Sequence, residues 1–227
     1  MLKAILFDAG DTLFRVRGSV GGVYAAVAAR HGVVVTPTEI EPRFRAAFRA
    51  MPPLGFPDAP PDELPAREYA WWKQLVATVF SGLPFPDFDA FFRDLFDFFA
   101  HGAAWELFAD TLPALAALRS RGLQLGIVSN FDGRLLRICA ELGIAGSVDV
   151  IVMSGRVGYA TPDPRIFAAA LARLGIAASA ALHVGDSERE DLAGARAAGL
   201  RSVLIDRNAT TANADRVVSL IEVVQRL

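Results

Sequence analysis

The chain has 227 residues, of which 53% are hydrophobic, and a formal net charge of -2 at pH 7. This composition supports a sizeable buried core, and the absence of a basic field excludes nucleic acid as a general partner. A single cysteine, Cys139, excludes an internal disulfide and fits a reducing compartment. Because no apolar run has the length of a membrane span and no signal peptide opens the chain, we expect no membrane partner and a soluble, cytoplasmic protein.

The first predicted element is a short buried strand over residues 3–8, an apolar run with acidic residues at its end. From about residue 15 to residue 104 the pattern predicts helices and no strand. In this stretch Thr36-Pro37-Thr38-Glu39 has the form of a capping box, with proline at the first helical position. Phenylalanines recur at helical spacing between residues 88 and 99. They could line a ligand pocket, but we interpret them as the core of a small helical bundle.

From residue 110 onward, predicted helices and strands alternate. Strands are expected at 123–128, 148–152, 181–185 and 202–205. The helices between them end at four glycines suited to a left-handed stop, which are Gly122, Gly143, Gly175 and Gly199. Such alternation predicts right-handed crossovers and a parallel sheet covered on both faces. The sequence therefore predicts an α/β core domain formed by residues 1–14 and 105–227, with an all-helical cap domain inserted at 15–104.

Polar residues follow the predicted strands at the sheet edge where open parallel sheets form their sites. Carboxylates from separate strands would repel one another there, and a divalent cation such as Mg²⁺, which prefers oxygen ligands, would relieve the repulsion. A hydroxyl can donate to a phosphate oxygen. We interpret His183 as a satisfied core histidine and Glu190 as part of a solvated helix start. The residues at the strand ends are Asp8, Asp11, Ser129, Asn130, the loop 154–161, Asp186 and Asp191.

Four segments resemble the motifs of the haloacid dehalogenase (HAD) superfamily of hydrolases. In chain order they are Phe7-Asp8-Ala9-Gly10-Asp11-Thr12-Leu13, Val128-Ser129-Asn130, Gly158 with Pro162-Asp163-Pro164-Arg165-Ile166-Phe167, and His183-Val184-Gly185-Asp186-Ser187 with Asp191. The helical insert after the first motif is similar to the C1-type cap of this superfamily. The second and third segments look most like the dehalogenase and phosphatase-like subfamily. The resemblance implies the HAD fold, with a Rossmann-like parallel sheet.

The resemblance also implies a role for each motif residue. Asp8 would be the nucleophile and would form a covalent aspartyl intermediate that water then hydrolyses. Asp8, the backbone carbonyl of Gly10 and Asp186 would hold Mg²⁺, with Asp191 nearby. Ser129 would bind a phosphoryl oxygen. The cap would close over the site, exclude water and select the substrate.

Two positions depart from the family pattern. Gly10 stands where phosphatases of the family carry an acid/base aspartate, and we interpret the neighbouring Asp11 as a turn residue. Thr161 stands where the family carries a lysine that offsets negative charge. A missing general acid costs about 10²–10⁴-fold in rate, and a missing charge stabiliser costs about 10²–10³-fold. An arginine could replace the lysine, although each is more simply a surface residue; the candidates are Arg15, Arg17, Arg165 and, favoured because they lie near strand ends, Arg134 and Arg156.

Three functions are compatible with this sequence. The first is Mg²⁺-dependent hydrolysis of a small phosphorylated metabolite through an aspartyl phosphate, slow and selective for good leaving groups. The second is dehalogenation of a 2-haloacid, which Gly10 favours. The third is a non-catalytic descendant that binds a phosphorylated ligand, which Gly10 and Thr161 together would explain. The expected substrate-binding residues are Ser129, Asn130, Thr161, Arg134 and Arg156, with Asp8, Ser129 and Asn130 as the catalytic set.

Overall fold

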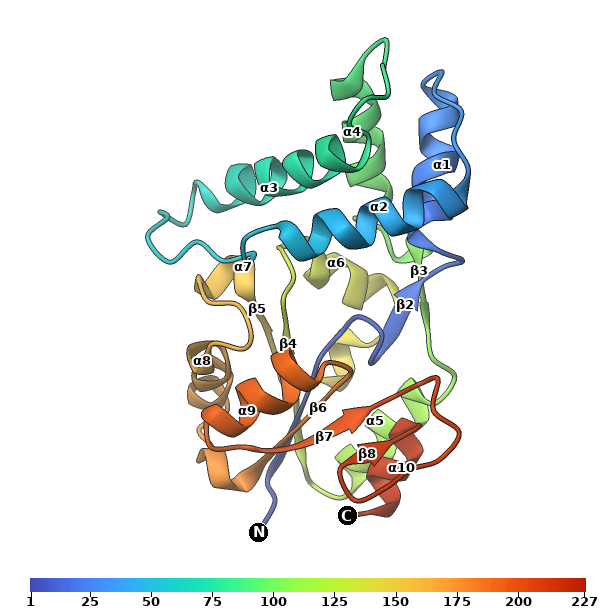
Figure 1. Cartoon of the computed structure of the whole chain (residues 1–227). Coiled ribbons are helices and arrows are strands. Elements are labelled where there is room, and N and C mark those ends of the chain that lie inside the picture. The colour runs from blue at the N-terminus through green and yellow to red at the C-terminus, as the bar shows by residue number, and fades with distance from the viewer.

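The computed structural model describes residues 1–227, with the elements arranged as in Figure 1. The strands are β1 (Ala4–Phe7), β2 (Phe14–Val16), β3 (Trp105–Leu107), β4 (Gln124–Ser129), β5 (Val150–Met153), β6 (Ala181–Gly185), β7 (Arg201–Ile205) and β8 (Arg216–Val217). The α-helices are α1 (Val20–Arg30), α2 (Pro37–Ala50), α3 (Leu64–Val79), α4 (Phe88–Phe98), α5 (Thr111–Ser120), α6 (Arg134–Glu141), α7 (Ser154–Val157), α8 (Pro164–Leu174), α9 (Gly194–Ala197) and α10 (Leu220–Gln225). The remaining turns are η1 (Gly102–Ala104), η2 (Ala145–Ser147), η3 (Ala178–Ala180) and the π-helical turn η4 (Glu188–Ala193).

The core is a six-stranded sheet in the order β5-β4-β1-β6-β7-β8, and every pair of neighbouring strands is parallel. The first strand lies between β4 and β6, so that Phe7 is in register with Ile127 on one side and Val184 on the other. The carboxyl ends of these three strands therefore meet at one edge. This architecture confirms the predicted α/β, Rossmann-like parallel sheet core.

Helices cover both faces of the sheet. Because successive strand residues point to opposite faces, Ile5 and Phe7 belong to an apolar cluster with α5, α6 and α10, while Ala4 and Leu6 belong to a cluster with α8 and α9. All four side chains are fully buried. Burial of each large apolar side chain is worth about 1.5–3 kcal/mol. Apolar packing on both faces therefore fixes β1 directly before Asp8.

Four helices, α1 to α4, lie above the carboxyl edge of the sheet, and we call them the cap (Figure 1). They have an apolar core of their own that includes Tyr24, Leu75 and Phe91. The predicted capping box at the start of α2 is confirmed. Glu39 N–H donates to the Thr36 hydroxyl at 3.3 Å, and Thr36 N–H donates to the Glu39 carboxylate at 2.8 Å.

The prediction that residues 15–104 contain no strand is wrong at its beginning. Arg15 and Val16 lie in β2, which pairs antiparallel with β3. A strand of three residues is too short to give an alternation pattern, and its partner lies about ninety residues away, so the sequence offered no local sign of it. This ribbon holds the two connections between core and cap side by side. The ribbon consists of residues 14–16 and 105–107 and so lies at both predicted domain boundaries, which stay a prediction.

Most other predicted elements of the core are found within one or two residues of their expected bounds. The four glycines expected to stop helices all have positive φ, at 75°, 76°, 67° and 82° for Gly122, Gly143, Gly175 and Gly199. The loop expected at 154–161 instead begins with the short helix α7. The last strand and helix, β8 and α10, were not predicted. None of the helices is both long enough and apolar enough to cross a lipid bilayer.

Candidate active site

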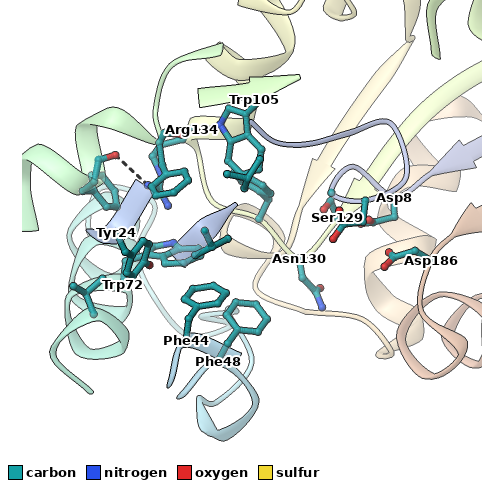
Figure 2. A pocket seen from close by; sticks show the side chains of 18 of the residues that line it. Asp8, Tyr24, Phe44, Phe48, Trp72, Trp105, Ser129, Asn130, Arg134 and Asp186 are labelled. Carbon is teal, nitrogen blue, oxygen red and sulfur yellow. Dashed lines mark hydrogen bonds between the residues drawn. The ribbon is translucent and has the colours of Figure 1, made fainter. Parts of the chain in front are cut away.

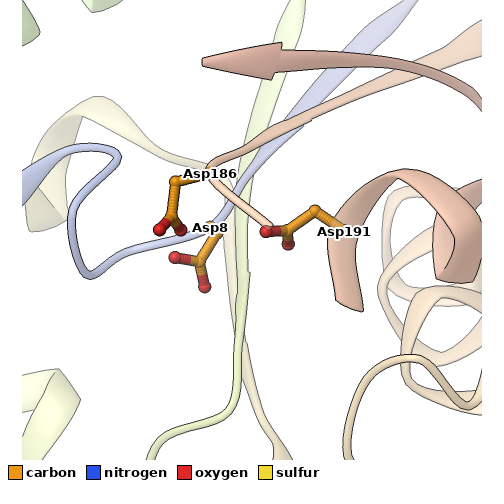
Figure 3. A group of neighbouring side chains, drawn as sticks. All are labelled: Asp8, Asp186 and Asp191. Carbon is orange, nitrogen blue, oxygen red and sulfur yellow. The ribbon is translucent and has the colours of Figure 1, made fainter. Parts of the chain in front are cut away.

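The carboxyl ends of β1, β4 and β6 bring Asp8, Ser129 and Asp186 together beneath the cap (Figure 2). Asp191, on η4, completes a group with Asp8 and Asp186 that we call the acidic cluster (Figure 3). One carboxylate oxygen of each member lies within 4.8 Å of the other two. The sheet topology therefore brings together the acidic residues that the sequence analysis expected at the ends of β1 and β6.

Crowding of negative charge dominates the electrostatics of this cluster. Burial, followed by the charges of Asp191 and Asp186, raises the pKa of Asp8 well above its usual range, and the neighbouring Ser129 hydroxyl opposes this only in part. Part of the Asp186 side chain remains exposed. The packing of protein around it, followed by the charges of Asp191 and Asp11, nevertheless raises its pKa to about 7. The cluster therefore favours either a bound proton or a bound cation.

Asp191 is held in place by two hydrogen bonds. One carboxylate oxygen lies 2.8 Å from His183 Nε2, and the other accepts from Ser187 N–H at 2.9 Å. His183 is fully buried, as expected of a core residue, but its Nδ1 atom has no hydrogen-bond partner. Gly185 makes this arrangement possible, because a Cβ there would lie 2.1 Å from Asp191 Cγ. A glycine is needed here because the aspartate approaches the strand so closely.

Ser129 and Thr161 form the neutral wall beside the acidic cluster. Ser129 is the last residue of β4 and is buried. Asn130 holds the backbone of Thr161: Thr161 N–H donates to Asn130 Oδ1 at 2.7 Å, and Asn130 Nδ2 donates to the Thr161 carbonyl at 3.2 Å. Asn130 therefore positions the segment that carries Thr161.

A cavity of about 310 Å³ lies between the acidic cluster and the cap (Figure 2). The residues of its polar end are Asp8, Gly10, Asp11, Ser129, Asn130, Thr161, Asp186, Glu190 and Asp191. Two of these residues agree with our sequence interpretation and line the cavity in addition. Glu190 is exposed in the first turn of η4, as expected of a solvated helix start. Asp11 lies in a turn with φ of +54°, a left-handed conformation that aspartate adopts more readily than most residues.

The phenylalanine stripe of α4 contributes to two environments. Phe91 is fully buried in the core of the cap, as we expected of the whole stripe. Phe92 is also almost fully buried in this core, and Phe96 and Phe99 pack against it, so the interpretation as bundle core is confirmed; all three line the cavity as well. The stripe lies on one face of the helix, so the same face supplies part of the cap core and part of the cavity wall.

The arginines proposed as substitutes for the missing lysine are engaged elsewhere. Arg134 lines the cavity, but its guanidinium binds the buried Asp132 carboxylate at 2.7 Å and donates to the Phe96 carbonyl at 3.2 Å. Arg156 is not part of the cavity wall and lies 3.6 Å from Glu68 of the cap. The remaining pairs are Arg15 and Arg17 with Glu106, and Arg165 with Asp163. None of these five arginines is therefore left free beside the acidic cluster.

A parallel sheet that brings acidic side chains together under a helical cap defines a class of α/β protein with its site at the carboxyl edge of the sheet. Residues 2–199 match the family model for a haloacid dehalogenase-like hydrolase, so the chain belongs to this family, as the motifs predicted. Haloacid dehalogenase-like hydrolase domain-containing protein 3 of Mus musculus is 37% identical over 208 residues, covering 90% of this chain and 82% of the mouse protein.

Two further similarities are to a phosphatase and to a dehalogenase. A phosphoserine phosphatase of Thermus thermophilus is 38% identical over 111 residues, which is 48% of this chain and 45% of that protein. The solved structure of an L-2-haloacid dehalogenase from Xanthobacter autotrophicus superposes with a TM-score of 0.72 at 21% identity, covering 99% of this chain and 98% of that chain. At this identity, the structural match shows a shared fold alone.

The close approach of Gly185 and Asp191 generates a first prediction. Replacement of Gly185 by alanine is expected to displace the Asp191 carboxylate and to lower the free energy of unfolding by about 1–3 kcal/mol, the usual effect of overpacking. Urea denaturation measures this loss. Gly146→Ala is the matched control, because a Cβ at Gly146 meets no atom within 4 Å. Equal stability of the two variants would contradict the assigned role of Gly185.

Proposed function

We propose that the protein hydrolyses phosphate monoesters, with Asp8 as nucleophile and Mg²⁺ as cofactor. The observation that carries the proposal is the meeting of three carboxylates within 4.8 Å of one another. The cavity around them has no free cation, since its only arginine is paired with Asp132. Family membership and the resemblance to a phosphoserine phosphatase over about half of the chain support the same reaction class.

The donor set fits Mg²⁺. Hard oxygen ligands from the carboxylates of Asp8 and Asp186, with the Gly10 carbonyl and Asp191 beside them, are the type that this ion prefers. The raised pKa values of Asp8 and Asp186 also indicate a site that lacks a positive charge. When bound, Mg²⁺ would offset the charge of the carboxylates and of the substrate phosphate.

The residues around the cavity then have separate roles in the reaction. An Asp8 carboxylate oxygen bonds to phosphorus while the ester P–O bond breaks, and the leaving alcohol oxygen takes its proton from water. A second water attacks the phosphorus of the aspartyl phosphate, which releases inorganic phosphate and restores the Asp8 carboxylate. Ser129 donates a hydrogen bond to a phosphoryl oxygen, and Asn130 acts by positioning Thr161. Because Gly10 supplies no acid, leaving groups that depart unprotonated are favoured.

The two other functions suggested by the sequence are less well supported. A 2-haloacid carries a carboxylate that needs its own cation, and the Arg134 guanidinium is already bound to Asp132. A non-catalytic, ligand-binding protein would not need Asp8 as a nucleophile. Halide release from 2-chloropropionate without metal would favour the first alternative, and phosphate-ester binding without turnover would favour the second.

Activity itself provides the most direct test. With Mg²⁺ present, the purified protein is expected to hydrolyse 4-nitrophenyl phosphate and acetyl phosphate, and removal of metal with EDTA is expected to abolish turnover. Asp8→Asn should lower the rate by at least about 10³-fold, because the nucleophile is lost. Asp163→Asn is the matched control, since Asp163 caps α8 away from the cavity and asparagine caps equally well. Turnover by Asp8→Asn at the wild-type rate would end this proposal.

Metal affinity is expected to depend on pH. A raised pKa means that a proton competes with Mg²⁺ for the Asp186 carboxylate, so affinity increases as pH rises and levels off above about 7. Between pH 6 and pH 8 we expect a gain of about tenfold, with proton release on binding. Calorimetry in two buffers of different ionisation enthalpy measures both. In Asp186→Asn the gain should shrink, and a pH-independent affinity of the wild-type protein would contradict this prediction.

Restoring the family's lysine is expected to raise activity. Thr161 is buried at the cavity wall, so a lysine there can extend its ammonium group into the cavity. We expect Thr161→Lys to raise kcat on 4-nitrophenyl phosphate by about tenfold or more, because one added charge stabiliser acts in the transition state. Thr161→Met, of similar length and without charge, is the control. Equal effects of the two substitutions would mean that charge is not what the site lacks.

A further inference from the structure

The cavity above the acidic cluster continues into an apolar compartment built by the cap (Figure 2). We call this compartment the aromatic chamber. Its rings come from all four cap helices and are those of Tyr24, Phe44, Phe48, Trp72, Phe92 and Phe96. The chamber and the acidic cluster belong to one cavity of about 310 Å³, so a molecule bound at Asp8 extends into the chamber.

The chamber is part of the cavity wall and not only the inner side of the packed cap core. Phe48 has 43% of its surface exposed, although the rings of Phe44, Trp71 and Trp72 all lie within 6.3 Å of it. Two other chamber rings, those of Tyr24 and Phe92, are almost fully buried and also belong to the core of the cap. A partly exposed aromatic ring that lines a cavity offers a surface suited to an apolar ligand.

The charges around the cavity exclude an anionic leaving group. Five carboxylates line the cavity, and Arg134 is its only basic side chain. The Arg134 side chain is only 11% exposed and binds Asp132 at 2.7 Å, so its charge is already neutralised. A second phosphate or a carboxylate on the substrate would therefore meet repulsion and no free cation.

Cationic and sugar-like leaving groups fit poorly as well. Aromatic faces attract cations, but the Arg134 guanidinium carbon already lies 3.9 Å from the Phe96 ring centroid and 5.0 Å from that of Trp72. The faces of these two rings are therefore already occupied by the Arg134 guanidinium. The hydroxyls of a sugar would lose water and find mostly ring carbon, which disfavours their burial.

We infer that the aromatic chamber binds the leaving group of the substrate, and that this group is neutral, apolar and the size of one or two aromatic rings. The inference rests on the proposed function, since it assumes that a phosphoryl group lies at Asp8. The cavity volume is at the small end of ligand sites, which limits the molecule to a phosphoryl group and a compact ring system. Burial of one such ring is expected to tighten binding by about 10²-fold.

Non-hydrolysable phosphonates test the chamber by binding alone. In the presence of Mg²⁺, calorimetry is expected to show that 1-naphthylmethylphosphonate binds about 10²-fold more tightly than methylphosphonate. The polar 3,4-dihydroxybutylphosphonate and the cationic 2-aminoethylphosphonate should bind no more tightly than methylphosphonate. If either matches the naphthyl compound, or if all four bind equally, the inference is overturned.

Two substitutions alter the chamber in opposite ways. Phe44→Ala removes part of its wall, and Val20→Phe fills it from the start of α1. Each is expected to reduce the preference for the naphthyl compound by about tenfold. Phe98→Ala is the matched control, because Phe98 is an exposed phenylalanine of the cap that lies outside this cavity. Thermal melting identifies variants that remain folded, and an unchanged preference in folded Val20→Phe overturns the inference.

Turnover separates this inference from the function on which it rests. Hydrolysis of acetyl phosphate by a protein with no naphthyl preference would overturn the inference and leave the proposed function intact. Tight naphthyl binding with no turnover of 2-naphthyl phosphate or acetyl phosphate would overturn the proposed function and leave the ligand class of the chamber standing.

Discussion

The repulsion among the carboxylates of the acidic cluster is the constraint on which the rest of the site depends. Parallel strands end at a common edge, so Asp8 and Asp186 are carried toward each other by the same hydrogen bonds that build the sheet. Separation of these charges would require breaking the register of β1 and β6. Burial of β1 on both faces opposes that change, and the free energy of the apolar core therefore holds the charges together.

A second set of polar contacts fixes the cap over this edge. Trp72 Nε1 of the cap donates to the Asp132 carboxylate at 2.5 Å, and Gly133 N–H donates to Glu68 at 3.3 Å. Arg134 completes the junction by binding both Asp132 and the Phe96 carbonyl. Asp132 is almost completely buried, and an unpaired charge there would be strongly destabilising. The arginine that the sequence suggested for catalysis is thus committed to placing the cap.

Whether a feature of the fold or the site could be predicted from the sequence depends on how far apart in the chain its interacting residues lie. Local patterns predicted the core strands, the glycine stops and the capping box at the start of α2, because each depends on neighbouring residues. The meeting of Asp8 with Asp186 followed from topology alone. The β2–β3 ribbon and the contact of Trp72 with Asp132 join segments about sixty or more residues apart, and no local pattern encodes them. The partners of Arg134 were likewise decided by packing.

The two departures from the family pattern and the shape of the cavity are consistent with each other. Without an acid at Gly10, the reaction favours a leaving group that departs as a stable anion, and aryl oxides meet this need better than alkoxides do. Without a lysine at Thr161, any further negative charge on the substrate would be unbalanced, and a neutral ring adds none. The aromatic chamber receives such a ring. The absence of an acid at Gly10 and of a lysine at Thr161 therefore favours the same class of substrate as the aromatic lining of the cap does, although these features arise in separate parts of the chain.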